Sequence, residues 1–281
     1  MTETAMPRSS GRAGLFRLPN LAQRVLTAAA GIPLIIGAVW AGGWWFAAVV
    51  AVAAAVAVLE VQASRRHLLN PVSLAAAALA ALLVVAAKLG FEDLPWALAL
   101  VALVPAAAIA LTRDPREQVI DWLWAVAPVV YIGWLAAHFV LLREAPDGRD
   151  WVLVTLLAVW IGDTGAYFVG RPLGRRKLAP HVSPGKTWEG AAGGQIAGFA
   201  AVAGLMQAFG LDADTVHVVA LGLLVPAAAL IGDLAESAIK RGLGVKDSSG
   251  LVPGHGGVLD RLDSLLFAAP TVYWYLRWLV L

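Results

Sequence analysis

The chain has 281 residues, of which 60% are hydrophobic and only 14% are charged. Soluble globular domains are about half apolar and about a quarter charged, so this composition excludes an ordinary water-soluble domain and predicts a protein whose natural solvent is lipid. The formal net charge is only +2, and the absence of cysteine excludes disulfides, thiolate nucleophiles and cysteine-ligated metals.

The chain begins with a polar, arginine-dotted segment that lacks the cleavage site of a signal peptide, and we expect residues 1–24 to form a cytoplasmic tail. Apolar runs then recur, each near the length of roughly 20 residues that a membrane-spanning helix needs. Alanine, leucine and valine dominate these runs, which favours helices over the alternating pattern of barrel strands. The nine predicted spans are Val25–Ala41, Trp44–Ala63, Val72–Ala87, Pro95–Leu111, Val119–Leu142, Trp151–Gly170, Trp188–Phe209, Val216–Gly232 and Leu262–Val280.

The distribution of lysine and arginine predicts the orientation of these spans. If the N-terminus is cytoplasmic and the spans alternate, 17 of the 21 basic residues fall in cytoplasmic segments, in agreement with the positive-inside rule. The others are Lys88, Arg143, Arg149 and Arg277. The sequence therefore predicts an all-α, polytopic membrane helix bundle of about nine transmembrane helices, with its N-terminus in the cytoplasm.

The two halves of the chain differ in polar content. Residues 25–150 read as an N-terminal transmembrane bundle with short loops. Residues 151–281 contain two long polar cytoplasmic segments, Arg171–Thr187 and Asp233–Arg261. We therefore expect residues 151–281 to form the catalytic transmembrane region.

The segment with the strongest signal is Gly232–Ser264, GDLAESAIKRGLGVKDSSGLVPGHGGVLDRLDS. Asp260 and Asp263 are three residues apart on one face of an expected helix, where carboxylate oxygens can share a hard cation such as Mg²⁺. Asp233, at a membrane boundary, can face the same ion. Acidic residues in a first helical turn also stabilise that turn by about 0.3–1 kcal/mol without any metal. For Asp260 alone that explanation suffices, whereas the crowding of the whole string favours a site.

The same segment carries groups suited to phosphate. The residues Lys240, Arg241, Lys246 and Arg261 can neutralise a polyphosphate. The glycine-rich turn at His255–Gly257 precedes a helix and can offer backbone N–H donors. A basic loop beside a membrane can instead set topology or contact anionic lipid.

A second polar segment is Trp160–Gly190, WIGDTGAYFVGRPLGRRKLAPHVSPGKTWEG. Asp163 lies within a predicted span, where a carboxylate is costly and is by default functional or paired inside the bundle. Ser183–Thr187 resembles part of a phosphate loop but lacks the Walker spacing. The basic residues Arg171, Arg175, Arg176 and Lys177 suit either a lipid phosphate or a topology signal.

The remaining polar residues have simple explanations. Glu60 lies near the cytoplasmic end of the second span, where a carboxylate can reach the interface, and Glu189 can simply begin the next helix. His138 and His217 are expected to be packing or interfacial residues. No HExxH, HxH or Ser-His-Asp pattern supports zinc or a hydrolytic triad.

The string from Ser237 to Asp263 resembles the signature of phosphatidate cytidylyltransferases, also called CDP-diacylglycerol synthases. That signature runs Ser, two residues, Lys-Arg, four residues, Lys-Asp, then Pro-x-His-Gly-Gly and Asp-Arg-x-Asp. It is met without a gap at Ser237, Lys240, Arg241, Lys246, Asp247, Pro253, His255, Gly256, Gly257, Asp260, Arg261 and Asp263. The upstream GDTGAY and SPGKTWEG also look like family elements, so the resemblance covers residues 160–264 closely and the rest only in topology.

The resemblance implies a multi-helical enzyme of phospholipid biosynthesis in a bacterial-type inner membrane, usually a homodimer, with its active site on the cytoplasmic face. It implies CTP and phosphatidate as substrates, CDP-diacylglycerol and pyrophosphate as products, and no nucleic-acid partner. It also implies that Asp233, Asp260 and Asp263 hold Mg²⁺, which a potassium ion can accompany, and that Lys240 belongs to the same site.

We expect an oxygen of the lipid phosphate to attack the α-phosphorus of CTP, in a reaction that depends mainly on positioning and charge neutralisation. Asp163 and the loop from Ser183 to Lys186 are expected to line the lipid-facing side. A CTP-dependent polyprenol kinase would use similar groups but release CDP. A CDP-alcohol phosphotransferase would show a DxxDGxxAR run with further aspartates, whereas Ser-Leu-Leu follows Asp263. A secondary transporter would show repeated halves with interrupted helices.

Overall fold

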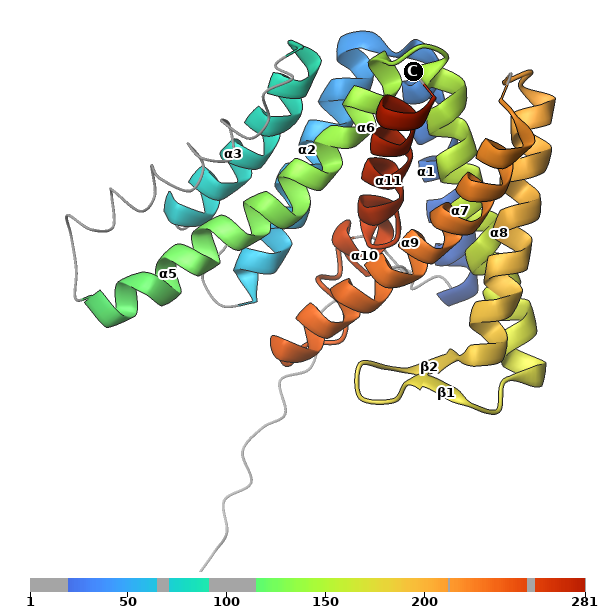
Figure 1. Ribbon diagram of the computed structural model, residues 1–281. Coiled ribbons are helices and arrows are strands. Elements are labelled where there is room, and N and C mark those ends of the chain that lie inside the picture. The colour runs from blue at the N-terminus through green and yellow to red at the C-terminus, as the bar shows by residue number, and fades with distance from the viewer. Residues whose placement is uncertain (1–19, 65–70, 91–114, 212, 252–255, 281) are drawn as a thin grey trace, which may run out of the picture.

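The computed structural model describes the backbone of residues 20–64, 71–90, 115–211, 213–251 and 256–280. Over these residues the protein is helical apart from one two-stranded hairpin (Figure 1). The first half contains α1 (Asn20–Ala41), α2 (Gly43–Ala63), α3 (Pro71–Lys88), α5 (Pro115–Pro128), the π-helix η1 (Val129–Trp134) and α6 (Leu135–Glu144). The second half contains α7 (Gly148–Leu173), β1 (Lys177–Ala179), β2 (Ser183–Thr187), α8 (Trp188–Ala208), α9 (Thr215–Gly242), α10 (Leu259–Leu262) and α11 (Leu265–Leu279).

The predicted membrane bundle is confirmed in its coarse form. Five helical segments of the described chain are long and apolar enough to cross a membrane, namely Gly43–Ala63, Pro71–Lys88, Trp122–Glu144, Gly148–Leu173 and Thr215–Gly242. Three further predicted spans coincide in sequence with α1, α8 and α11. The predicted span Pro95–Leu111 lies outside the described residues. The count of nine and the cytoplasmic N-terminus stay predictions.

The hairpin is the one element that the all-α prediction lacks. Its strands are antiparallel, with Lys177 opposite Thr187 and Ala179 opposite Ser183. The N–H of Val182 donates to the carbonyl of Ala179 at 3.2 Å and closes the turn. The sequence predicts only a polar segment here. A strand of three residues, such as β1, is too short to show the alternating pattern that predicts a strand.

Small residues bring α7 and α8 into close contact. A Cβ atom on Gly193 would lie 2.5 Å from Cβ of Val169, and one on Gly162 would lie 3.3 Å from the carbonyl oxygen of Gly194. Glycine at such positions lets two helix backbones approach closely in a membrane. The contact fixes the position of the part of α7 that carries Asp163.

The long helical segment from Trp122 to Glu144 changes its winding in the middle. Pro128 ends α5, and the π-helix η1 follows it directly. Proline has no N–H to donate to the preceding turn, so the regular bonding pattern is interrupted there and a wider turn is accommodated.

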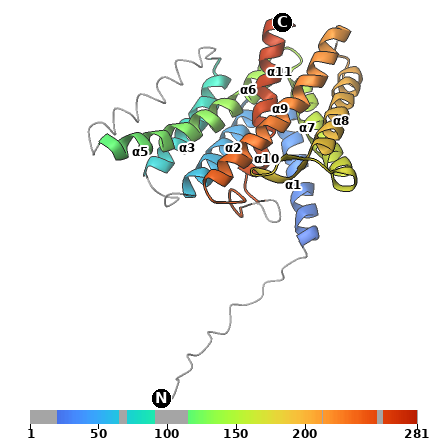
Figure 2. The same cartoon turned by 60° about the horizontal axis from the view of Figure 1, so that its bottom comes forward.

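The elements that carry the polar segments meet at one end of the bundle. Figure 1 shows α3 and α5 on one side, α7 and α8 on the other, and the hairpin extending beyond the ends of α7 and α8. Figure 2 brings this end of the bundle forward, where Arg241 of α9 bonds to Val182 of the hairpin and Lys240 of α9 bonds to Asp260 of α10. The break between α10 and α11 occurs at Asp263 and Ser264. The bundle therefore brings the two polar segments of the sequence to the same place.

Candidate active site

A cavity of about 700 Å³ lies among α1, α2, α6, α7, α9 and the α10–α11 segment. The residues contributed by α1, α2 and α6 carry no charge, and most are apolar, including Ile32, Phe46 and Phe139. The charged residues of the wall are Asp163 from α7, Asp233 from α9, and Asp260, Arg261 and Asp263 from the α10–α11 segment. The cavity therefore joins an apolar wall to a charged one.

Three of the four lining aspartates interact as like charges, and we refer to Asp163, Asp233 and Asp263 as the acidic triad. The charge of Asp233 acts unfavourably on the ionised forms of both Asp163 and Asp263. Asp233 pairs with Lys186 of β2 and accepts a hydrogen bond from the Ser237 hydroxyl at 3.3 Å. Because like charges repel at short range, this group favours the arrival of positive charge.

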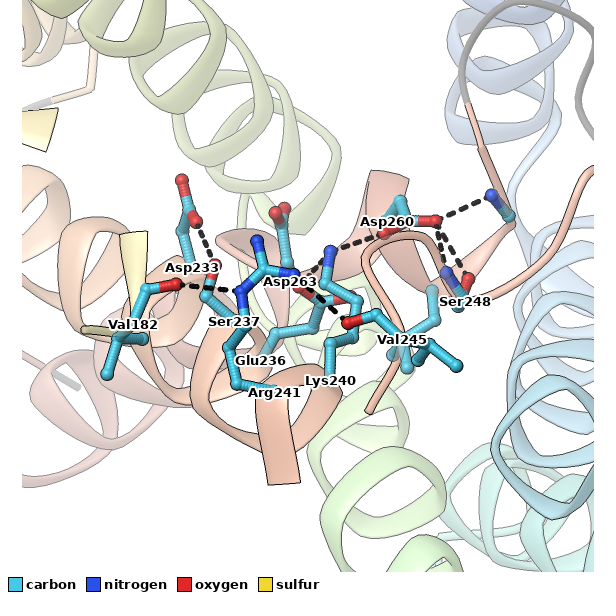
Figure 3. Close-up of polar contacts among 12 residues, drawn as sticks. Val182, Asp233, Glu236, Ser237, Lys240, Arg241, Val245, Ser248, Asp260 and Asp263 are labelled. Carbon is cyan, nitrogen blue, oxygen red and sulfur yellow. Dashed lines mark hydrogen bonds and ion pairs between the residues drawn. The ribbon is translucent and has the colours of Figure 1, made fainter. Parts of the chain in front are cut away.

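Asp260 is held differently, by donors from the protein itself. Its Oδ1 accepts a hydrogen bond from Nζ of Lys240 at 2.5 Å. Its Oδ2 accepts from the Ser248 N–H at 3.0 Å, the Ser248 hydroxyl at 2.8 Å and the Gly257 N–H at 2.7 Å (Figure 3). Burial raises the pKa of Asp260, but these donors outweigh it and hold the pKa below its usual value. The Asp260 carboxylate is thus stabilised in its ionised form.

Lys240 lies between two carboxylates. Its Nζ lies 2.7 Å from Oε2 of Glu236, which is one turn earlier on α9. The same Nζ also donates to Asp260 (Figure 3). The side chain of Glu236 is 0% exposed and that of Lys240 is 13% exposed. A buried charge pair is stable only when its geometry and further hydrogen bonds compensate for lost hydration. Asp260 has such further hydrogen bonds, whereas neither oxygen of Glu236 has a hydrogen-bond partner beyond this ion pair among the described residues. The bond to Asp260 therefore fixes the ammonium group of Lys240 beside the cavity.

Glu60 of α2 joins the same group from the first half of the chain. It is buried, and it accepts hydrogen bonds from the hydroxyl groups of Ser248 and Ser249. We refer to Glu60, Lys240, Ser248, Gly257 and Asp260 together as the Asp260 network. The interpretation of Glu60 as an interfacial carboxylate missed this role, although one charged residue in an apolar span is a signal for function.

The other residues expected at the site lie around this centre. Arg241 donates to the carbonyls of Val182 at 3.3 Å and Val245 at 3.1 Å, so it ties the hairpin to the end of α9. Lys246 and Asp247 are exposed on the following loop. Ser183, at the start of β2, is half-buried. His255 lies outside the described residues.

Two glycines of the predicted phosphate-binding turn have steric reasons to be glycine. Gly256 has φ of 82°, a left-handed conformation that other residues rarely adopt. A Cβ atom on Gly257 would lie 2.6 Å from Oε1 of Glu60 and collide with the Ser248 hydroxyl. The turn therefore has a packing role in the Asp260 network. Its predicted role as a phosphate donor stays a prediction.

A metal role was expected for Asp233, Asp260 and Asp263. Within the part of the chain that the structure describes, no three His, Asp or Glu side chains are grouped closely enough to hold an ion. Asp233 and Asp263 do offer carboxylate oxygens in the cavity wall, and such hard donors suit Mg²⁺ together with substrate phosphates. Both Asp260 and Asp233 already have protein donors on both carboxylate oxygens. The metal role stays a prediction.

Comparisons with known proteins identify the family of this chain. The profile of the cytidylyltransferase family matches residues 22–279. The chain is 47% identical over 154 residues to a phosphatidate cytidylyltransferase of Brucella suis, covering 53% of this chain and 56% of that protein. It is 39% identical over 148 residues to the Bacillus subtilis protein of the same name, covering 52% and 55%. It is 40% identical over 183 residues to that of Haemophilus influenzae, covering 62% and 63%. The matches thus span less than two thirds of these relatives.

Proposed function

The chain belongs to the cytidylyltransferase family, and on that premise we propose that it transfers CMP from CTP to phosphatidate. The products are CDP-diacylglycerol and pyrophosphate, and the relatives that carry the name phosphatidate cytidylyltransferase support this choice. The observation that carries the proposal is the cavity of about 700 Å³, in which apolar side chains meet Asp163, Asp233 and Arg261. Such a wall suits a substrate with acyl chains and a phosphate headgroup.

The reaction needs positioning and charge neutralisation more than covalent chemistry by the protein. An oxygen of the lipid phosphate attacks the α-phosphorus of CTP, the bond from that phosphorus to the β-phosphate bridging oxygen breaks, and pyrophosphate leaves. Arg261 lines the cavity, and Lys240 lies beside it, paired with Asp260. Both cationic groups can neutralise the developing charge. No general base is required when the lipid phosphate arrives as a dianion.

We propose that the reaction uses Mg²⁺, with Asp233 and Asp263 as ligands and Asp260 as a third. The ion supplies charge neutralisation at the nucleotide phosphates. All three carboxylates already accept hydrogen bonds from the protein. Asp260 accepts from Lys240, Ser248 and Gly257, Asp233 accepts from Lys186 and Ser237, and Asp263 accepts from the Ser264 N–H. A potassium ion in the same site remains part of the proposal.

We also propose the membrane arrangement that places this site on the cytoplasmic face of a bacterial inner membrane. The five long apolar helices and the bias of lysine and arginine support nine spans with a cytoplasmic N-terminus. In this arrangement CTP reaches the charged part of the cavity from the cytoplasm and the lipid reaches it from the bilayer. A homodimer is part of the same proposal.

The test is the identity of the products. Purified protein in nanodiscs, given phosphatidate, Mg²⁺ and CTP labelled on the α-phosphate, should form a labelled lipid and release pyrophosphate. Release of CDP together with a phosphorylated lipid alcohol would instead indicate a kinase. Absence of a labelled lipid with fully folded protein would refute the cytidylyltransferase proposal.

A further inference from the structure

Glu60 is a buried carboxylate that reaches the second half of the chain. It is the one charged residue among the 21 residues of α2, and it is 5% exposed. Its Oε1 accepts hydrogen bonds from the Ser249 hydroxyl at 2.6 Å and the Val258 N–H at 2.9 Å. Its Oε2 accepts from the Ser248 hydroxyl at 3.1 Å and the Leu259 N–H at 2.9 Å. All four donors are 188 or more residues away in sequence.

Two of these donors belong to the loop at residues 248 and 249 and two to the backbone just before Asp260. The Ser248 hydroxyl lies within hydrogen-bond distance of both Glu60 and Asp260, and the Ser248 N–H also donates to Asp260. The N–H groups of Val258 and Leu259 belong to the backbone directly before Asp260. Glu60 therefore fixes the backbone that carries Asp260 and one of the groups that bond its carboxylate.

A carboxylate within an apolar helix is costly unless its hydrogen bonds are satisfied. An apolar side chain would pack α2 against its neighbours at no such cost, so packing alone does not account for Glu60. What the carboxylate adds is four directed acceptor contacts, and all of them end on residues 248, 249, 258 and 259. Gly257 leaves room for this approach, because a side chain there would strike Glu60.

We propose that Glu60 is a positioning residue for the reaction, which holds Asp260, and through it Lys240, in the geometry that the transferred phosphate requires. The inference rests on the proposed cytidylyl transfer. It also assigns the N-terminal helices a part in the active site, since α2 supplies the acceptor and the C-terminal half supplies the donors. Glu60 acts through other residues and is not itself a catalytic residue.

The first experiment compares Glu60→Gln with wild-type full-length protein in nanodiscs. The variant keeps the size of the side chain but loses the charge and one acceptor, so kcat should fall by about 10- to 100-fold, as for partners that orient a reactive group. KM for CTP should change little, because the displaced groups act in the transition state. Glu60→Asp, which keeps the charge, should recover part of the lost kcat.

The matched control is Gln62→Leu, two residues further along α2. Gln62 is also buried, and its side chain donates to the Trp124 carbonyl at 2.7 Å, away from the Asp260 network. This variant should lower Tm and leave kcat of the folded protein unchanged. If Glu60→Gln lowers Tm as the control does but keeps the wild-type kcat, Glu60 is only structural and the proposal fails.

Hydrogen exchange separates this proposal from the proposed function. The amides of Val258 and Leu259 should exchange faster in Glu60→Gln than in wild-type protein, with α7 unchanged. If the wild-type protein were inactive, the proposed cytidylyl transfer would be refuted. If exchange at these amides were unaltered in Glu60→Gln, the positioning role of Glu60 would be refuted. If Glu60→Gln does not fold, Ser249→Ala removes one of the four hydrogen bonds and should lower kcat in the same direction by less. An unchanged kcat in that variant would contradict the proposal.

Discussion

The acidic triad and the Asp260 network contain aspartates that are only three residues apart in the chain, yet their carboxylates are held in different ways. Asp263 lies among like charges from Asp163 and Asp233. Asp260 receives four hydrogen bonds from the protein, one of them from the ammonium of Lys240. In the triad only Asp233 has a lysine partner, Lys186, whereas in the network four protein donors converge on the Asp260 carboxylate. We therefore predict that the triad contributes more than the network to binding a cation.

The largest effect is expected from Asp263→Asn in the triad. The change removes a negative charge from the cavity wall but keeps an oxygen that can accept from the Ser264 N–H, now bonded at 2.7 Å. Turnover should fall by about 100- to 1000-fold, as when a stabilising group of the transition state is lost. Tm should stay the same or rise, because repulsion with Asp233 is relieved. A turnover near that of wild type would refute the role of the triad in cation binding.

Asp260→Asn should combine a loss of activity with a loss of stability. The amide carries no negative charge to pair with Lys240. Only its oxygen can accept hydrogen bonds, so some of the buried donors that now bond to Asp260 lose their acceptor. Leaving such groups unsatisfied costs about 1–3 kcal/mol, and Tm should fall accordingly in a melting experiment. Turnover of the remaining folded protein should fall by about 10- to 100-fold. If Tm is unchanged, the two groups of aspartates do not differ as the structure indicates.

Lys186 tests the connection between the triad and the hairpin. Its ammonium group pairs with Asp233, and both side chains are about one quarter exposed. Lys186→Met removes the cation that pairs with Asp233 of the charged wall, and kcat/KM for CTP should fall by about tenfold or somewhat more, the value of one charge-assisted hydrogen bond. Lys186→Arg keeps the charge and should retain most of the activity. Equal losses in both variants would show that the length of the side chain matters more than its charge.

The sequence predicted that Asp233, Asp260 and Asp263 lie together, and all three line one cavity, but it did not separate the acidic triad from the Asp260 network. The prediction came from the shared helix face of Asp260 and Asp263, the position of Asp233 at a membrane boundary and the crowding of charged residues and glycines in one segment. The i, i+3 spacing of Asp260 and Asp263 does not distinguish the two carboxylates. They differ because Asp260 bonds to Lys240 and Ser248, which are 20 and 12 residues away from it in the chain.

The contacts of Glu60 could not be predicted from the sequence, because its partners are far away along the chain. The partners of Glu60 are 188–199 residues distant, so no local pattern around it predicts the contact. The break between α10 and α11 falls at Asp263 and Ser264, inside the predicted span Leu262–Val280, because the leucines that follow Ser264 let one helix be read across it. Composition and periodicity predicted the helical membrane bundle, since these properties are local. Contacts between distant segments are not encoded in that way.

The smallest effect is expected from an ion pair that belongs to neither group. Lys88 of α3 and Glu144 of α6 are 2.8 Å apart, and the side chain of Glu144 is 41% exposed. The side chain of Lys88 is only 14% exposed, but Glu144→Gln should still change stability by only about 0–1 kcal/mol, because solvent reaches the pair from the Glu144 side and the amide oxygen of the glutamine can still accept from the Lys88 ammonium. Turnover should match wild type. The variant thereby measures the value of a lysine–carboxylate pair outside the site. If its effect equalled that of Asp260→Asn, the stability assigned to the Asp260 network would be a general property of ion pairs in this protein and not of the four donors that converge on one carboxylate.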